Sequence, residues 1–249
     1  VYSAYYVWVN GKRVGYAEDS KLPSEFDITE YVNKSGSNLL AVEVYRWCDG
    51  SYLEDQDMFR FSGIFRDVTL WSRPKDGLWD FSVKTEVAED YKSAKLFVTV
   101  DGADGTGAEA VSIYDAAKNK LGELKYNADL KSFAIDLKNV ELWSAEKPVL
   151  YTLVVQKGSD IRSKRIGFKE QKIVNGTFYV NGKPIKFKGV NRHECSPDNG
   201  RTITLSDMIR DVTLMKRYNI NTVRTAHYPD HHLWYDICDK YGIYLVAEA

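Results

Sequence analysis

Histidine is the chemically versatile side chain that this sequence distributes most unevenly. The chain has four histidines in 249 residues, and three of them, His227, His231 and His232, fall within INTVRTAHYPDHHLWYDICDKYG at residues 220–242. The fourth, His193, lies upstream in GVNRHE. Imidazole can bind a metal ion, transfer protons or switch charge near neutral pH. Because no histidine precedes His193, we expect these side chains to serve one local site.

The sequence around the histidines predicts alternating strands and helices. From about residue 170, apolar segments typical of strands (185–191, 220–226 and 243–249) alternate with segments of helical spacing (204–219 and 230–242). Thr204 or Ser206 can cap the first helix, while the second has Asp230 near its start and Gly242 at its end. Short links in this order require parallel strands joined by crossover helices.

The carboxyl ends of these three predicted strands are polar. The first leads into His193, the second into Arg224 and His227, and the third into Glu248. In a β/α barrel, functional residues collect at that end of the strands. Because parallel strands place these ends on one face, we expect the four side chains to line one site.

Plainer interpretations of the same residues stay open. His231 and His232 fall on the first turn of a predicted helix, where one of them is expected to be a surface residue. His227 and His231 are four residues apart and could share a zinc ion, but His227 precedes the helix, so the two do not share a helical face. Arg224 could simply pair with a structural acid.

The rest of the chain predicts two β-rich units ahead of the α/β unit at 170–249. In residues 1–74, apolar runs flank Asn10-Gly11, a strong signal for a hairpin, and further strands are expected at 38–47 and 63–72. Residues 75–169 hold closely spaced strand-like pieces separated by turns, which predicts a small β-sandwich that acts as a spacer. A second Asn-Gly hairpin, at Asn181-Gly182, opens the last unit.

The amino-acid composition limits which binding partners and which cellular compartment are expected for this protein. A net charge of −1 argues against binding to nucleic acid or to a charged membrane surface, and no run approaches the ~18 apolar residues of a membrane span. Three widely spaced cysteines form no metal pattern and are too few for a disulfide scaffold, which favours a reducing compartment such as the cytoplasm. The periplasm stays open. The aromatic content of 13% fits either a sugar-handling protein or β-rich structure.

Four motifs resemble family 2 of the glycoside hydrolases. They are NTVRTAHYPDHHLWYDICDKYGIYLV (221–246), GVNRHE (189–194), LWSAEKPVLY (142–151) and RWCDGSYLEDQDMFRFSGIFRDV (46–68). The last motif is more similar to the large bacterial β-galactosidases, multi-domain enzymes that cleave lactose, than to the β-glucuronidases or β-mannosidases. The resemblance implies a partial jelly-roll sugar-binding domain at 1–74, an immunoglobulin-like β-sandwich at 75–169, and the first strands and helices of a catalytic (β/α)8 TIM barrel at 170–249.

The family chemistry is retaining hydrolysis. One Glu protonates the leaving oxygen and a second Glu attacks the anomeric carbon, with the two carboxyl groups about 5–5.5 Å apart. The resemblance also implies a magnesium ion beside the acid and a sodium ion at the 6-hydroxyl of galactose. It makes Asp57 the sodium ligand and a 6-hydroxyl contact, and makes His193 and His227 ligands of galactosyl hydroxyls. It places Arg224 behind the catalytic carboxylates and Glu248 in a supporting role.

The same resemblance places several family residues outside this chain. Both catalytic Glu residues and the magnesium ligands are expected beyond Ala249, and an asparagine used at the sugar is expected before Val1. The chain alone is therefore predicted to be inactive, with no catalytic residue of its own, while the parent protein is expected to be a β-galactosidase that forms a homo-oligomer.

Three alternatives remain. A β-glucuronidase of the same family is disfavoured by the acidic SYLEDQD stretch, because a uronate pocket should carry basic residues. A non-catalytic carbohydrate-binding fragment should bind galactose through residues 1–74 alone. A purely structural fragment should only assemble other subunits.

Overall fold

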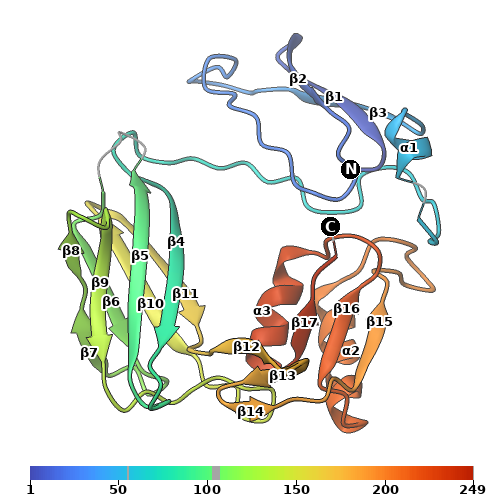
Figure 1. The fold of residues 1–249 in the computed structure, drawn as a ribbon. Coiled ribbons are helices and arrows are strands. Elements are labelled where there is room, and N and C mark those ends of the chain that lie inside the picture. The colour runs from blue at the N-terminus through green and yellow to red at the C-terminus, as the bar shows by residue number, and fades with distance from the viewer. Residues whose placement is uncertain (55, 103–106, 249) are drawn as a thin grey trace.

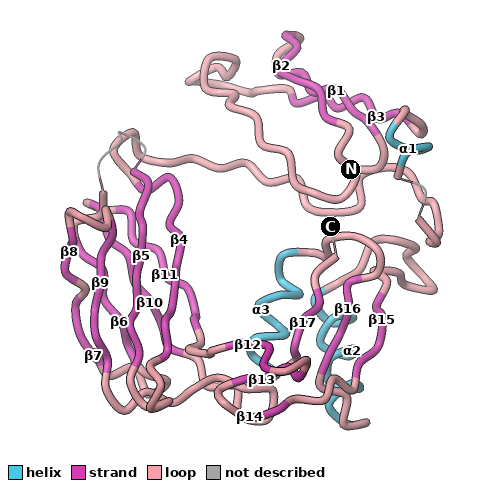
Figure 2. Tube along the Cα trace, viewed as in Figure 1, coloured by secondary structure: helices cyan, strands magenta, loops and turns pink. Residues whose placement is uncertain are grey.

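The chain forms three units that follow one another in sequence. The computed structural model describes residues 1–54, 56–102 and 107–248. A small sheet with long loops comes first, a β-sandwich second and an α/β unit last, as Figure 1 shows. Strands and loops dominate, as Figure 2 shows, and none of the described helices is long and apolar enough to span a membrane.

The first unit, which we call the front unit, is built on a three-stranded antiparallel sheet. Its strands β1 (Ala4–Val9), β2 (Lys12–Ala17) and β3 (Leu40–Tyr45) pair in the order β2-β1-β3. The β1–β2 hairpin turns at Asn10 and Gly11, both with positive φ (51° and 77°), which Asn and Gly adopt readily and which suits a tight hairpin. The helical turn α1 (Gly50–Leu53) follows β3 and leads into the loop that carries Asp57. The expected strands on both sides of Asn10-Gly11 and within 38–47 are thus confirmed.

The strand expected at 63–72 is wrong. The structure assigns no strand there, and Gly63 forms a single bridge to Tyr2, with two hydrogen bonds of 3.0 and 2.6 Å. Beyond that bridge the described residues provide no neighbouring strand, and Leu70 and Trp71 are 78% and 70% exposed. A strand-like sequence forms a strand only where a partner satisfies its backbone hydrogen bonds.

The second unit is a sandwich of two four-stranded sheets. One sheet has the order β4-β5-β9-β8 and the other β11-β10-β6-β7. In the first sheet the strands are β4 (Leu78–Val87), β5 (Ala94–Gly102), β8 (Lys125–Asn127) and β9 (Ser132–Leu137). In the second they are β6 (Ala110–Tyr114), β7 (Lys120–Glu123), β10 (Tyr151–Lys157) and β11 (Asp160–Ile166). Alternate residues such as Leu96, Val98, Leu153 and Val155 are fully buried between the sheets.

A short hairpin sheet joins the sandwich to the last unit. It consists of β12 (Gln171–Val174), β13 (Thr177–Val180) and β14 (Lys183–Pro184), and it confirms the turn predicted at Asn181-Gly182. Trp143 of the sandwich donates its indole N–H to the Asp239 carbonyl at 2.7 Å and packs edge-on against Tyr244. The sandwich is therefore fixed to the α/β unit by a buried aromatic contact.

The third unit, which we call the barrel unit, has three parallel strands and two helices. Its strands β15 (Gly189–Arg192), β16 (Thr222–Thr225) and β17 (Tyr244–Val246) lie side by side in that order. The helices α2 (Leu205–Arg217) and α3 (His232–Tyr241) connect them. The predicted β-α-β-α-β order is confirmed, although the first strand begins at Gly189 rather than at Ile185. One buried cluster, centred on Trp234, Met208 and Val223, packs the helices on the sheet.

The helix ends follow the predicted chemistry. Thr204 caps α2, because its hydroxyl accepts the Asp207 N–H at 3.2 Å while the Asp207 carboxylate accepts the Thr204 N–H at 2.9 Å. Gly242 ends α3 in the left-handed region (φ 75°), where an added Cβ would lie 2.3 Å from the Ala145 carbonyl oxygen. Asp230 lies just before α3, but His231 is the residue that caps this helix.

Thr204→Ala is expected to reduce the free energy of unfolding of the barrel unit by about 1 kcal/mol, because the variant loses the side-chain half of the capping box. The measurement is urea-induced unfolding followed by circular dichroism. Thr213→Ala, at an exposed position in the middle of the same helix, is the matched control and should be neutral or slightly stabilising, since alanine is the better helix former. An equal loss in both variants would contradict the assignment of Thr204 as the cap.

Candidate active site

The carboxyl ends of the three parallel strands bring together the side chains predicted to share a site. The rings of His193 and His227 lie 5.3 Å apart, edge to face at 75°. Arg224 Nη2 lies 3.3 Å from His227 Nδ1 and forms an ion pair with Glu248. Glu248 Oε1 is in turn 3.6 Å from His227 Nδ1. The four residues therefore form one continuous polar cluster, with Arg224 paired to an acid that belongs to the same cluster.

Asp57, in the front unit, exerts an electrostatic effect on this cluster. Its carboxylate is exposed on the loop after α1, and its charge raises the pKa of His193, although other effects on that ring are larger. Figure 1 shows the geometry that allows this, because the carboxyl ends of β15, β16 and β17 face the front unit. Asp57 therefore acts electrostatically on His193, although the two residues are 136 positions apart in the sequence.

The surroundings of His193 favour the neutral form of its imidazole. The pKa of His193 lies below its ordinary value of 6.5, first because partial desolvation of this otherwise exposed residue disfavours the charged ring, and then because of the electrostatic effects of His227 and Arg201. A neutral imidazole has one N–H donor and one acceptor nitrogen. That pair of functions suits hydrogen bonds to sugar hydroxyl groups, which also donate and accept.

The segment that carries His193 is fixed by residues that the sequence analysis did not single out. Arg192 and Glu194, on either side of it, are buried, while His193 itself is exposed. Arg192 pairs with Asp230 at 2.8 Å and Asp211 at 3.1 Å. The signal was present in the sequence, because charged residues flank His193 at the end of a strand, where alternate side chains point in opposite directions.

The two remaining histidines lie apart from the polar cluster. His231 is buried, accepts the Leu233 N–H at 3.2 Å as the cap of α3, and stacks on His232 at 4.3 Å. His232 is the exposed member of the pair, as expected. His231 therefore has a structural role in starting α3, and the zinc alternative gains no support from its position.

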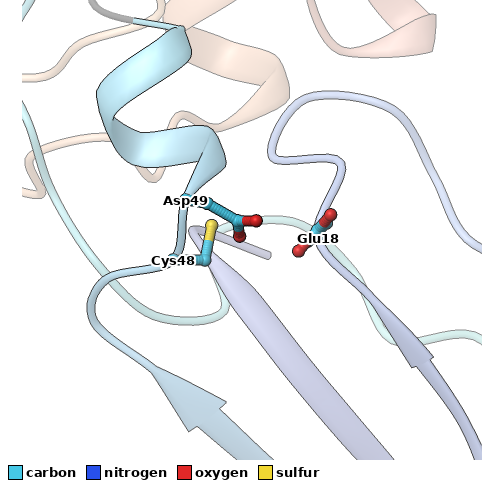
Figure 3. Close-up of side chains that lie close together, drawn as sticks. All are labelled: Glu18, Cys48 and Asp49. Carbon is cyan, nitrogen blue, oxygen red and sulfur yellow. The ribbon is translucent and has the colours of Figure 1, made fainter.

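Among the described residues, one group of three acidic and thiol side chains could approach a metal ion together. Its possible ligand atoms, on Glu18, Cys48 and Asp49, lie within 4.8 Å of one another, as Figure 3 shows. It belongs to the front unit and contains neither a histidine nor Asp57. Asp57 offers one carboxylate of the kind that a hard cation binds, and the described residues place it in no such group. Asp57 could therefore supply one ligand to a sodium ion, and the sodium site itself stays a prediction.

Comparisons with known proteins match the whole chain to domains of one enzyme family. Sequence models of three domains match consecutive ranges: glycosyl hydrolases family 2, sugar binding domain, at 1–74; glycosyl hydrolases family 2 at 77–169; and glycosyl hydrolases family 2, TIM barrel domain, at 171–249. Among curated proteins, the chain is 44% identical to the β-galactosidases of Priestia megaterium, Vibrio vulnificus and Clostridium acetobutylicum. These alignments cover 100% of this chain but only 26%, 26% and 29% of the respective relatives. The chain thus spans little more than a quarter of their length.

Solved structures with a similar fold include those of two β-glucuronidases. The β-glucuronidase of Bifidobacterium dentium superposes with a TM-score of 0.88 at 26% identity, over 99% of this chain and 48% of that one. The β-glucuronidase of Dictyoglomus thermophilum gives a TM-score of 0.79 at 26% identity, over 99% of this chain and 46% of that one. These likenesses support the fold of all three units.

Proposed function

Because the chain belongs to family 2 of the glycoside hydrolases, we propose that the whole protein that carries it is a retaining β-galactosidase acting on terminal β-D-galactosides such as lactose. One observation carries the choice of sugar: the chain is 44% identical to β-galactosidases along its entire length. The acidic Asp57 of the front unit, whose charge acts on His193, supports the same choice.

Each residue of the polar cluster has a role that its surroundings support. His193 and His227 hydrogen-bond hydroxyl groups of the galactosyl ring, and they do so most strongly as charge develops in the transition state. Arg224 stands between His227 and Glu248 and supplies the cation that keeps nearby carboxylates ionised. Glu248 holds Arg224 and His227 in place. Asp57 accepts a hydrogen bond from the 6-hydroxyl.

The chemical step itself requires two carboxyl groups that flank the glycosidic bond, one as acid and one as nucleophile. In this proposal they come from the rest of the whole protein and meet the sugar held by the cluster. A sodium ion at Asp57, a magnesium ion beside the acid and assembly into a homo-oligomer remain proposals that rest on the family resemblance.

A β-glucuronidase is the main alternative, since the similar solved structures carry that activity. A glucuronide has a carboxylate at the 6-position, where a galactoside has a hydroxyl. Asp57 would repel that carboxylate but would accept a hydrogen bond from the hydroxyl. The charge of Asp57 therefore favours the galactoside.

The proposal is tested by comparing kcat/KM of the whole protein for nitrophenyl β-D-galactoside and nitrophenyl β-D-glucuronide. We expect a preference for the galactoside of at least about 10²-fold, because a site built to bond a hydroxyl rejects an analogue that leaves its polar groups unpaired. Retention of the anomeric configuration in the product, read by proton NMR, checks the mechanism. A preference for the glucuronide, or galactose binding without turnover, would refute the assignment.

A further inference from the structure

A partly buried ion pair joins the front unit to the barrel unit directly beside His193. Glu194 follows His193, and its carboxylate is only 1% exposed. Glu194 Oε2 accepts a hydrogen bond from Arg66 Nη2 of the front unit at 2.7 Å, and Glu194 Oε1 accepts the backbone N–H of His231 at 2.7 Å. The Glu194 N–H donates to the Tyr228 hydroxyl at 3.0 Å. The turn after β15 is thus held from three directions.

Arg66 connects more than this one carboxylate. Its Nη1 donates to the Lys21 carbonyl at 2.6 Å within the front unit, and its Nη2 also donates to the Pro229 carbonyl at 2.9 Å in the loop that follows His227. A planar guanidinium can serve three acceptors in fixed directions, which the single ammonium of a lysine cannot reproduce. Arg66 therefore links the front unit at once to the segment after His193 and to the segment after His227.

A second arginine, Arg201, links the loop that carries Asp57 to the barrel unit. Arg201, in the loop after β15, donates to the Phe59 carbonyl, two residues after Asp57. Its guanidinium also lies 5.0 Å from the centre of the Tyr228 ring, the same Tyr228 whose hydroxyl accepts from Glu194. Arg201 therefore fastens the loop that carries Asp57 to the loop that follows His193.

We propose that Arg66 and Glu194 are positioning residues, which form a clamp that sets His193 at the right distance from Asp57 across the boundary between the two units. The proposal rests on the galactosidase assignment and deepens it. In this proposal neither side chain contacts the sugar, because the Glu194 carboxylate is buried and the Arg66 guanidinium donates to acceptors within the protein. Their effect on turnover passes through the geometry of the pocket, where a misplacement of about 1 Å can reduce the rate about 10²-fold.

A double-mutant cycle in the whole protein tests this clamp. Arg66→Gln is made in the native background and in a His193→Asn background, and kcat/KM for nitrophenyl β-D-galactoside is measured in all four proteins. If Arg66 acts through the position of His193, its loss should lower kcat/KM by at least about tenfold when His193 is present and by less than about threefold when it is absent. Equal losses in both backgrounds, or no loss in either, would overturn the proposal.

Two further variants separate positioning from folding. Arg73→Gln changes another arginine of the same segment, which donates a hydrogen bond to the Trp79 carbonyl and lies over the Trp79 ring in the sandwich, and it should leave kcat/KM unchanged. Arg66→Lys keeps the charge but not the three directed hydrogen bonds, so it should recover only part of the activity. This variant replaces Arg66→Gln in the cycle if the glutamine variant fails to fold, with the same two outcomes.

Amide hydrogen exchange tests whether the clamp exists even if the galactosidase assignment fails. If the native protein does not hydrolyse the galactoside, the proposed function is refuted, but Arg66→Gln should still speed amide exchange in peptides 56–66 and 193–201 together by at least about tenfold. Arg73→Gln should change neither peptide. Unchanged exchange in both peptides of Arg66→Gln would overturn the clamp.

Discussion

His227→Phe is expected to lower kcat for nitrophenyl β-D-galactoside about 10²–10³-fold, with a much smaller change in KM, because it removes a transition-state hydrogen-bonding group. The phenyl ring preserves the edge-to-face packing on His193, which lies 5.3 Å away between ring centres. It cannot replace the ring nitrogen that lies 3.3 Å from Arg224. The decrease in kcat should therefore measure the lost hydrogen bonding of His227 and not a change in its packing.

Two control variants make the result specific. His227→Asn retains a donor and an acceptor at the same place and should recover part of the lost rate. His232→Phe makes the same change at the exposed histidine, which stacks on His231 and lies outside the polar cluster, and should leave kcat unchanged. Equal losses in His227→Phe and His232→Phe would remove His227 from the site.

Trp234→Ala is expected to destabilise the barrel unit by about 3–5 kcal/mol, the range seen when a large buried aromatic side chain is removed. Trp234 is fully buried in α3, packs in the cluster with Met208 and Val212, and lies 4.0 Å beneath the Arg192 guanidinium. Its loss would leave a cavity under the strand that leads to His193. Activity should fall with stability, because Arg192 would lose the surface on which it rests.

The measurement is amide hydrogen exchange within α2, α3 and β16, which should become at least about 10²-fold faster for a loss of this size. Trp234→Phe keeps most of the ring and removes an indole N–H that has no hydrogen-bond partner among the described residues, so it should lose far less. Trp79→Ala, at a largely exposed position of the sandwich, should leave the same amides unchanged. Fast exchange in the Trp79 variant would show that the effect is not local.

The arrangement of the barrel unit could be predicted from the sequence because its signals are local. Apolar spacing, the cap at Thr204 and the stop at Gly242 define the two helices, and short links then force the strands to be parallel. Once the strands are parallel, His193, Arg224, His227 and Glu248 must lie at one edge of the sheet. The prediction of their proximity needed no knowledge of individual contacts, and the roles given to these residues are tested by the variants above.

The strand expected at 63–72 shows where local signals fail. Its β-branched and aromatic residues favour extended backbone, but a strand also needs a neighbour in register, and the described chain supplies only the bridge between Tyr2 and Gly63. The clamp could not be predicted for a related reason. Arg66 and Glu194 are 128 residues apart in sequence, and nothing near either residue identifies the other. Pairings between units depend on how the units pack.

The most direct test of the account compares two substrates in Asp57→Asn. Nitrophenyl α-L-arabinopyranoside has the ring of the galactoside without the 6-CH2OH group, so only the galactoside can use Asp57. We predict that Asp57→Asn lowers kcat/KM for the galactoside by about 10–10²-fold, the range for a hydrogen bond to a charged group, and changes that for the arabinopyranoside by less than about threefold. An equal loss for both substrates would contradict the central claim that Asp57 of the front unit accepts a hydrogen bond from the 6-hydroxyl of a galactose held by His193 and His227.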